Sequence, residues 1–562
     1  MRTPPRWWPD LLPAIGGVFV LQLFVRQFAL RVGYPFDLEW MEGGMLLHAD
    51  RVLKGEGIYV PPSMEFIPFI YPPLYPWVLA ACAKVFGLGY AVGRTISFLG
   101  TLVACGALVA AVRREGGTIL LGLGAVGLFL STYDETGAFM DLVRADGLTV
   151  ALLSWSFVCA RAQWWRAAGL LLVLAFTGKH TNAVFGLCTL LWAWRFHGRA
   201  AASRYALWSV VPALLFTGGL ELATRGWFLT YLVGVPSVHP YNGQRGFPGA
   251  QLDIAQALPV ALVLGLCAVA LATRVRRWMA LALVGALVGA PLAFAFALQK
   301  TGTLSSWQRA ASRALGTTDV LAEYARGLFS PPEAFACVVA APFLLALFAV
   351  AAKRARFTEG SAFWAGQIAT GVVLGAIMRA HHGGYVNVLL PAMWLVSLWA
   401  AVGAQAIVAA WTGSTIVRVA TGLALLCQCA IGRWDLARFA PTPEDVTAGN
   451  ELIERLRAID GDVFSPQHPY YPVLAGKKPS FALISLWDIN HPRGPLTHFE
   501  KKVEKAFEEK RWAAVLTSDK SLGYGLEKGY VRDPTFRPPE GRAMRPKSGW
   551  PARPGQLWIP KP

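Results

Sequence analysis

The sequence predicts a polytopic α-helical membrane protein of about thirteen transmembrane helices, followed by a small α/β domain at its C-terminus. Three observations lead to this prediction. Of the 562 residues, 55% are hydrophobic and only 15% are charged, whereas soluble proteins carry about 25% charged residues. The mean hydropathy is +0.43. Apolar stretches of about 20 residues recur through most of the chain, as in helical membrane proteins.

Changes in hydropathy and polar turns set the limits of the expected spans. Several are short for a spanning helix, so two neighbours could form a broken helix or a re-entrant pair. The spans are 11–31, 89–112, 117–132, 146–161, 166–179, 181–197, 204–224, 255–273, 278–298, 334–352, 361–379, 386–410 and 414–432. They divide the chain into a membrane domain, 1–433, and a C-terminal domain, 434–562.

Charges in the loops predict the orientation. Basic clusters at 113–114, 161–166, 195–204, 274–277 and 353–356 all fall on one side. Lys and Arg concentrate in cytoplasmic loops, so this side and the N-terminus are predicted to be cytoplasmic. An odd number of spans then places the C-terminal domain outside a plasma (inner) membrane. The same loops and anionic lipid explain the net charge of +18 better than a nucleic acid partner does.

One long outer loop departs from this charge rule. The loop 299–333 carries Lys300, Arg309, Arg313 and Arg326 on the predicted outer side. A lipid-linked phosphate is one partner that suits them, and anionic lipid headgroups are the alternative.

The C-terminal domain has its own secondary-structure signals. Thr442 followed by Pro443 predicts a helix to about residue 458. Thr497 and Glu500 form a predicted capping box for a helix to about residue 510. Short strands are expected at 463–465 and 513–517, and the chain after Asp533 is expected to be largely extended.

The first outer loop, 32–88, is the strongest functional signal. Asp37, Glu39 and Glu42 lie within six residues, directly after the first apolar stretch. Carboxylates beside a membrane are costly to place, which favours chemistry or ion binding. Such an acid can deprotonate a sugar hydroxyl, or hold a divalent metal that bridges a phosphate. The alternative is that the acids pair with basic residues of the loop, Arg31, Arg51 or Lys54, and only stabilise it.

Two surface helices are expected in the same loop, one following Glu42 and one at 72–87. The first would turn Leu46, Leu47, Val52 and Leu53 to the membrane and His48, Asp50, Arg51 and Lys54 to water.

These motifs resemble a known family. The segments DLEWMEGGMLLHADRVLKGEGIY and IYPPLYPWVLA are similar to the first loop of the GT-C superfamily of integral membrane glycosyltransferases, above all bacterial members related to protein O-mannosyltransferases and lipid A aminoarabinose transferases. The resemblance covers residues 1–430 by architecture and about the first 150 by motif. The family often has adjacent Asp-Glu at the catalytic position. This chain has Met41-Glu42 there, so the base is one of Asp37, Glu39 and Glu42.

The resemblance implies a reaction class and its partners. A sugar would pass from a polyprenyl-phosphate donor to an acceptor hydroxyl at the outer face, with inversion. The acceptor would be a lipid, a glycan or a protein. A divalent metal occurs in the superfamily, but no ligand spacing here indicates one, and the eight cysteines all lie in apolar stretches without a disulfide or zinc pattern.

Two further segments carry residues that the resemblance places at the site. In DLVRADGL, Arg144 and Asp146 match an Arg-x-Asp pattern whose acid faces the active cavity. Asp146 could equally serve as a helix N-cap. In GKHTN, Lys179 is expected at the outer end of a span, where it would bind phosphate or snorkel to the interface.

The turn MRAHHGGYVN supplies the remaining candidates. Arg379 is expected to bind phosphate and Asn387 to bind sugar. His381 and His382 lie beside them, but adjacent histidines on a helix rarely ligate one metal. The other polar turn, HPYNGQRG, is expected to be a solvated loop, with cover for the cavity as the alternative.

Two other function classes stay open. The first is a transporter or flippase of lipid-linked sugars, although transporters concentrate polar groups near the bilayer midplane and few charges occur there in this chain. The second is a non-catalytic scaffold of the cell envelope.

Overall fold

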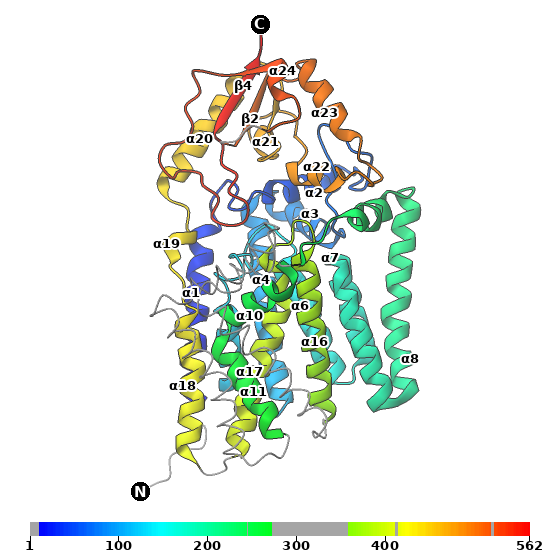
Figure 1. Ribbon diagram of the computed structural model, residues 1–562, viewed down its shortest axis with the longest axis vertical. Helices are drawn as coiled ribbons and strands as arrows, with labels where there is room; N and C mark the ends of the chain where they lie inside the picture. The colour runs from blue at the N-terminus through cyan, green and yellow to red at the C-terminus, as the bar shows by residue number, and fades with distance from the viewer. Residues whose placement is uncertain (1–9, 244, 273–357, 411–413, 519–521) are drawn as a thin grey trace, which may run out of the picture.

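The computed structural model describes residues 10–243, 245–272, 358–410, 414–518 and 522–562. The molecule is elongated, with a bundle of long helices at one end and a mixed helical and β-sheet region at the other (Figure 1). The predicted spans 278–298 and 334–352 and the basic loop 299–333 lie outside the described residues.

The helix bundle follows the predicted spans closely. Five helices within the described ranges are long and apolar enough to cross a membrane, or six if the bent pair at 415–458 forms one span. The chain is therefore a multi-pass membrane protein, and the count of thirteen spans stays a prediction. The bundle helices are α1 (Leu11–Arg31), α4 (Tyr90–Arg114), α5 (Ile119–Leu130), α6 (Asp146–Arg161), α7 (Trp165–Gly178), α8 (Ala183–Ala223), α11 (Pro259–Ala272), α16 (Glu359–Ala380), α17 (Leu390–Ala410) and α18 (Thr415–Ile431).

Helix α8 consists of two arms. Gly198 interrupts it with φ of 83° and ψ of 178°, a conformation open to glycine. Both arms pack on α7, since Leu172 contacts Gly186 of the first arm and Gly169 lies against Trp208 of the second. The two arms correspond to the predicted spans 181–197 and 204–224.

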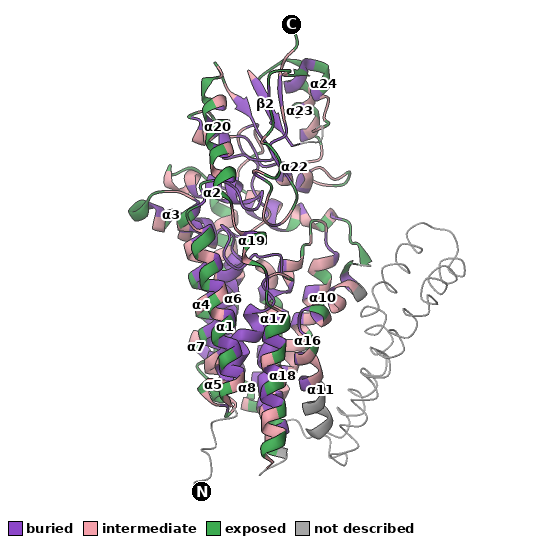
Figure 2. Ribbon diagram, turned by 90° about the vertical axis from the view of Figure 1, so that its left-hand side faces the viewer, coloured by how far each residue is buried: buried purple, intermediate pink, exposed green. Residues whose placement is uncertain are grey.

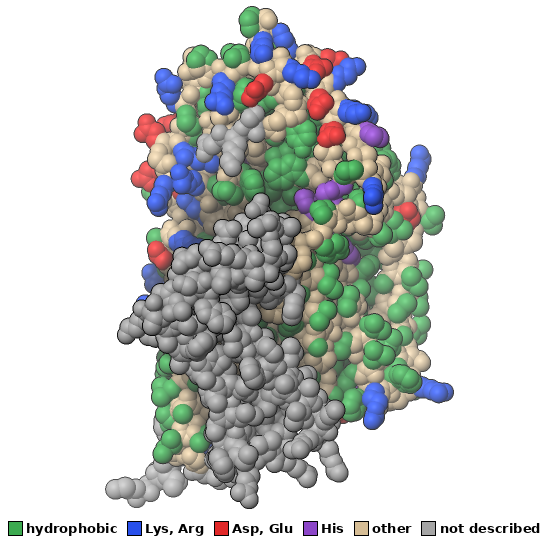
Figure 3. All heavy atoms as spheres, in the orientation of Figure 1, with side chains coloured by type: hydrophobic (Ala, Val, Ile, Leu, Met, Phe, Trp, Pro, Cys, Tyr) green, Lys and Arg blue, Asp and Glu red, His purple; other side chains and the backbone are tan. Residues whose placement is uncertain are grey.

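The two ends of the bundle differ in chemistry. At one end Arg114 donates to the carbonyl of Arg161 (2.5 Å), and Arg161 pairs with Glu115 (2.8 Å) and Glu359 (2.7 Å). These contacts gather loops that were predicted to share the cytoplasmic side. On the face shown in Figure 3, hydrophobic side chains cover the flank of the bundle and charged side chains gather at its ends. Which end faces the cytoplasm stays a prediction.

The first loop lies at the opposite end. It contains α2 (Glu42–Leu53) and α3 (Leu74–Phe86), at the positions predicted for surface helices. One expectation for α2 is wrong, because His48 is buried rather than turned to water. Its ring contacts the carbonyl of Gly44 (2.7 Å) and accepts from the Phe69 amide (2.9 Å). Burial lowers the pKa of His48 to about 4, which keeps the ring neutral as an acceptor.

Several short elements complete this end of the bundle. They are η2 (His180–Asn182), α9 (Trp227–Leu229), η3 (Thr230–Gly234), η4 (Pro236–Val238), η5 (Arg245–Gly249), α10 (Ala250–Ala257) and η6 (Val386–Leu389).

The C-terminal segment, 434–562, has helices around a four-stranded sheet. The strands are β1 (Val463–Phe464), β2 (Ala514–Thr517), β3 (Tyr530–Arg532) and β4 (Gln556–Pro560), in the order β1-β2-β4-β3. Strands β1 and β2 are parallel, with Val463 opposite Ala514, and the other pairs are antiparallel. The helices are α19 (Leu436–Phe439), α20 (Pro443–Ala458), α21 (Tyr471–Leu474), α22 (Leu483–Ile489), α23 (Phe499–Glu508) and α24 (Leu526–Gly529).

Helix capping in this segment was predicted correctly at one helix and wrongly at another. Thr442 and Asp445 form the capping box of α20. The N-cap of α23 is His498 rather than Thr497, and it makes no side-chain cap. Glu500 instead accepts a hydrogen bond from Asn490 (2.5 Å), so it is not available to complete a box.

The hydrophobic core crosses the boundary between the first loop and the C-terminal segment. One cluster joins Phe36 and Leu38 to Leu452, Leu456 and Leu516. Figure 2 shows buried residues continuing from the bundle into the upper region. The first loop and the C-terminal segment therefore share one hydrophobic core. This packing sets the positions of the polar groups between them.

Candidate functional site

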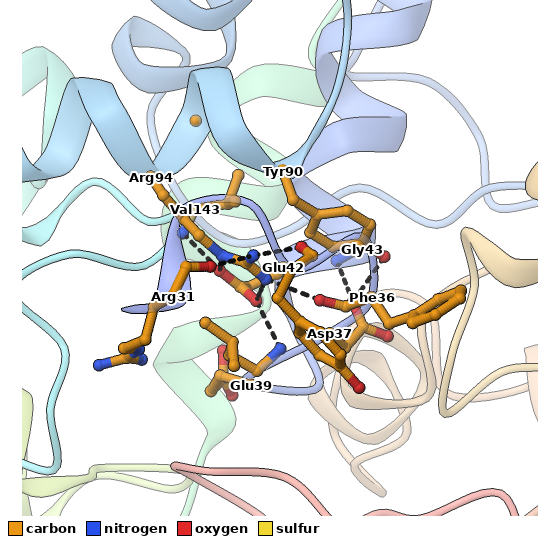
Figure 4. Close-up of polar contacts among 12 residues, drawn as sticks. Arg31, Phe36, Asp37, Glu39, Glu42, Gly43, Tyr90, Arg94 and Val143 are labelled. Atoms are coloured by element: carbon orange, nitrogen blue, oxygen red, sulfur yellow. Dashed lines mark hydrogen bonds and ion pairs between the residues drawn. The ribbon is translucent and has the colours of Figure 1, made fainter. Parts of the chain in front are cut away.

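Arg94, near the start of α4, organises the loop that carries the three acids. It is fully buried. Its guanidinium donates to the carbonyls of Arg31 (3.1 Å), Tyr34 (2.5 Å) and Phe36 (2.7 Å), and it makes two bonds to Glu42, of 3.1 and 2.8 Å. All five N–H donors are thereby used. Figure 4 shows Arg94 and Glu42 facing each other at the centre of this network.

Glu42 is a saturated anion. Besides the two bonds from Arg94, it accepts from the backbone amides of Leu38 (2.7 Å) and Val143 (2.9 Å). Burial alone would raise its pKa, but the Arg94 guanidinium and the two amides lower it. The four lone-pair positions of the carboxylate are filled, which leaves none for a substrate proton.

Asp37 joins the loop to the C-terminal segment. One carboxylate oxygen accepts from the Gly43 amide (3.0 Å) and the Tyr90 hydroxyl (2.9 Å), and the other contacts Nδ1 of His468 (3.0 Å). Burial raises the pKa of Asp37, against the effect of His468. Both oxygens are therefore occupied by contacts that hold the fold together.

Glu39 has the most open carboxylate of the three. Its Oε2 accepts from the Met41 amide (3.3 Å) and pairs with Arg144 (3.2 Å). Its Oε1 accepts no hydrogen bond from any residue in the described ranges. Burial raises the pKa of Glu39 to about 7, although Arg144 opposes the shift. A carboxylate with this pKa exchanges a proton near neutral pH.

A polar network continues from Glu39 into the bundle. Arg144 pairs with Asp146 (3.4 Å), whose Oδ1 accepts from Lys179 (2.5 Å) and from the amide of Asn387 (2.9 Å). Five predicted site residues from four separate segments are thus connected. All are buried except Lys179, whose side chain is 19% exposed.

The N-cap interpretation of Asp146 is wrong. The N-cap of α6 is Ala145, and no side chain caps that helix. Asp146 is the first residue of α6, and its carboxylate is committed to Arg144, Lys179 and Asn387.

Arg379 lies outside this network. It pairs with Asp253 (3.0 Å) and donates to the carbonyl of Gly384 (2.9 Å). Its neighbours His381 and His382 belong to a histidine cluster with His239 and His491. Ring centroids lie 4.9 Å apart for His239–His381, 5.2 Å for His239–His382, 4.7 Å for His239–His491 and 4.9 Å for His382–His491.

The histidine cluster joins three parts of the chain. His239 is buried, whereas residues 240–243 and Arg245 are exposed, so HPYNGQRG is the expected solvated loop apart from its two ends. Nε2 of His239 contacts the carbonyl of Asp488 in α22 (2.7 Å). Figure 3 shows histidine side chains near the boundary of the C-terminal segment and the bundle. Within the part of the chain that the structure describes, no three His, Cys, Asp or Glu residues are placed to hold a metal ion.

Sequence reasoning missed Arg94 and His468. Arg94 did carry a signal, because an arginine near the start of an apolar span is expensive and needs a partner. His468 carried none, since it lies 431 positions from Asp37.

Comparisons with known proteins give distant structural neighbours. No family model and no curated protein matches the sequence. ArnT from Cupriavidus metallidurans bound to undecaprenyl phosphate is 13% identical over 89% of this chain and 92% of that chain, with a TM-score of 0.44. Its apo structure gives a TM-score of 0.42. Arabinofuranosyltransferase AftD from Mycobacteria is 12% identical over 99% of this chain but only 40% of its own, with a TM-score of 0.47. These likenesses assign no role to any residue here.

Removing Arg94 should destabilise the protein strongly. The variant Arg94→Met leaves the Glu42 carboxylate buried without its cation, which costs about 3–5 kcal/mol. Chemical unfolding in detergent micelles measures the loss. The double variant Arg94→Met/Glu42→Gln should recover part of it. Lys54→Met is the matched control, because Lys54 is 58% exposed in its pair with Asp50 and the loss should stay below about 1 kcal/mol. Equal losses in the two single variants would contradict the role given to Arg94.

Acidification should loosen the docking of α22. Burial lowers the pKa of His239 to about 4 and lowers those of His381, His382 and His491. A histidine released from the cluster has a pKa of about 6.5. The undocked state therefore binds more protons between these values, so docking is fully stable above about pH 6.5 and weakens as pH falls toward 4.

Amide exchange of residues 483–495, corrected for its intrinsic pH dependence, should therefore rise between pH 7.5 and 5.5. Arg245 also faces the cluster, and its positive charge opposes protonation of His382 in the docked state, which adds to the effect. His180 faces His381, but burial lowers the pKa of His180 to about 4, so it stays neutral over this pH range. Helix α20, which contains no histidine, is the internal reference. The double variant His382→Asn/His491→Asn should lose most of the effect. Unchanged exchange in the wild-type protein would exclude a pH-dependent contact.

Proposed function

We propose that this protein is a GT-C-type glycosyltransferase that moves a sugar from a polyprenyl-phosphate donor to an acceptor hydroxyl. The observation that carries the proposal is Glu39. It is a buried acid with a pKa of about 7 that is linked through Arg144 to Asp146 and Lys179, and one of its oxygens accepts no hydrogen bond from the described part of the chain. The resemblance of the first loop to the GT-C superfamily supplies the reaction class.

Glu39 is proposed as the general base. Its carboxylate takes the proton of the acceptor hydroxyl as that oxygen bonds to the anomeric carbon of the sugar. The bond between the anomeric carbon and the phosphate oxygen breaks, and its electron pair leaves with the polyprenyl phosphate. A single displacement of this kind inverts the anomeric centre. Asp37 and Glu42, whose oxygens are already occupied, position the loop.

Lys179 and Arg144 are proposed to stabilise the departing phosphate. Fixed cations aimed at developing negative charge are an effective form of catalysis in a water-poor site. Lys179 is the partly exposed cation of the network. It donates to Asp146, which also accepts a hydrogen bond from Asn387. Arg379, His381 and His382 are proposed to contact the donor from the adjacent turn. Asn387 is also within reach for a sugar hydroxyl.

The proposed orientation places this site outside the plasma membrane. Two observations support it: Arg114 and Arg161 meet at the end of the bundle opposite the acids, and basic loops favour the cytoplasm. Residues 1–433 would then form the membrane domain with a cytoplasmic N-terminus, and 434–562 the extracytoplasmic domain. The polyprenyl donor and the bilayer are the partners this arrangement requires.

Substituting the first-loop acids separates the three candidates. Glu39→Gln should lower transfer from a labelled polyprenyl-phosphate sugar by about 10²–10⁴-fold, the usual contribution of a general base. Transfer is measured in membranes supplied with acceptor extracts. Glu56→Gln, a half-exposed acid of the same loop, is the control and should keep full activity.

Other results of these substitutions would point to a different base or to a different function. If Asp37→Asn abolishes transfer while Glu39→Gln does not, the base is Asp37. If Asp37→Asn, Glu39→Gln and Glu42→Gln all retain transfer, the loop is not catalytic. Purified protein that moves labelled lipid across liposomes without transferring sugar would indicate a flippase.

The pH profile should report the base directly. Because Glu39 must be ionised to accept a proton, the single-turnover rate should rise with pH to a plateau, with a midpoint of about 7. Replacing Arg144 by Met removes the cation that opposes protonation, so the midpoint should move upward. A midpoint below pH 5, or one that Arg144→Met leaves in place, would contradict the assignment.

A further inference from the structure

Asp488 of α22 is a buried acid that none of the roles above uses. It is 6% exposed and has no ion pair or side-chain hydrogen bond among the residues that the structure describes. Burial raises its pKa to about 8. Its oxygens are not among the fully enclosed side-chain atoms that lack a partner, so a polar ligand that reaches the carboxyl can supply the hydrogen bonds that no described residue makes.

The position of Asp488 is set from both sides. His239 contacts its backbone carbonyl (2.7 Å), which fixes the end of α22. Its carboxyl interacts electrostatically with Tyr71, whose hydroxyl is bonded to Arg144. Asp488 thus borders the network of Glu39 and Arg144 from the side of the C-terminal segment.

Three tryptophans meet next to this network. Ring centroids lie 5.5 Å apart for Trp40–Trp487, 5.6 Å for Trp487–Trp550 and 6.1 Å for Trp40–Trp550. Trp550 is 45% exposed, which is unusual for so large a ring within an aromatic cluster. Its indole is therefore partly accessible to a ligand.

Each tryptophan is the chain neighbour of a residue at the polar site. Trp40 follows Glu39, and Trp487 precedes Asp488. Trp550 follows Gly549, which lies so close to Glu39 that a Cβ there would approach its Cγ to 2.7 Å. The aromatic cluster and the two acids are consequently built into the same small region.

This pairing of groups suits a sugar. An indole face packs against the C–H face of a pyranose or furanose ring, and a carboxyl group bonds to hydroxyls. A carboxyl with a pKa of about 8 is mostly protonated at pH 7, so it both donates and accepts, which favours an uncharged ligand.

We propose that Asp488, Trp40, Trp487 and Trp550 form the subsite for the acceptor, and that the acceptor is an uncharged carbohydrate. The proposal rests on the proposed glycosyltransferase function. It places the acceptor against the C-terminal segment, with a hydroxyl directed to Glu39, while the lipid-linked donor approaches from the side of Lys179.

Saturation-transfer NMR on the full-length protein tests the subsite without the reaction. The probes are uncharged methyl glycosides and short oligosaccharides of glucose, mannose, galactose and arabinose. At least one should bind saturably. Trp550→Ala and Asp488→Leu should weaken it by about tenfold or more, whereas Asp488→Asn, which keeps donor and acceptor atoms, should weaken it less. Trp164→Ala is the matched control, because Trp164 is 65% exposed and precedes α7 at the opposite end of the bundle.

Binding of undecaprenyl phosphate, measured on the same variants, separates this proposal from the proposed function. All four variants should bind it as the wild type does. Absence of saturable sugar binding, or equal binding by Trp550→Ala, Asp488→Leu and the wild type, would overturn the acceptor subsite while leaving transfer to another acceptor class intact. Sugar binding that persists in a protein unable to transfer from any polyprenyl-phosphate sugar would overturn the enzyme and retain the subsite.

Discussion

The buried ion pair of Arg94 and Glu42 is the constraint on which the rest of the site depends. Two desolvated charges are stable inside a protein only when nearly every donor and acceptor is satisfied. Here Arg94 uses its remaining donors on three carbonyls of the loop, and Glu42 uses its remaining lone pairs on two amides. One of those amides belongs to Val143. The pair therefore sets not only the path of residues 31–42 but also the position of Arg144, the next residue, against Glu39.

The C-terminal segment buries the acids of the first loop. His468 holds Asp37, and Gly549 lies directly against Glu39, so both acids become buried when the segment packs on the first loop. Burial is also the main cause of the raised pKa values of Asp37, Glu39 and Asp488. Without this packing the carboxylates would face water and titrate near 4. The chemistry proposed for Glu39 is thus a product of tertiary packing between residues that lie hundreds of positions apart.

The sequence predicted what depends on local signals. Helix limits such as 11–31 and 146–161 agree with the structure because apolar length is a local property. Glu39, Arg144, Asp146, Lys179 and Asn387 were found as polar residues beside apolar spans, where they are expensive. These five residues are one another's partners, but the partners of Glu42 and Asp37 were not found. The alternative to a chemical role was that Arg31, Arg51 or Lys54 neutralises the acids. In the structure Arg31 pairs with Asp141, and the cation at Glu42 is Arg94. Asp488 carried no signal, because its significance lies only in the packing of α22 on Tyr71.

The acids of the first loop have different roles: Glu42 anchors the loop, and Glu39 is the proposed base. Glu42 meets a bidentate guanidinium and two amides, and its pKa falls. Glu39 meets one arginine nitrogen and one long amide contact, and its pKa rises to about 7. Two acids of the same type, three positions apart, are driven in opposite directions by the number of donors that face them, which is how enzymes separate an anchor from a base. Gly549 of the C-terminal segment lies directly against Glu39. With φ of 70° and its Cα against Glu39, it allows the chain to cover the base closely, so that Glu39 is 1% exposed while its Oε1 accepts no hydrogen bond from a described residue. A side chain at position 549 would displace either Glu39 or the tryptophan cluster that includes Trp550. The same close contact therefore positions both the base and the proposed acceptor subsite.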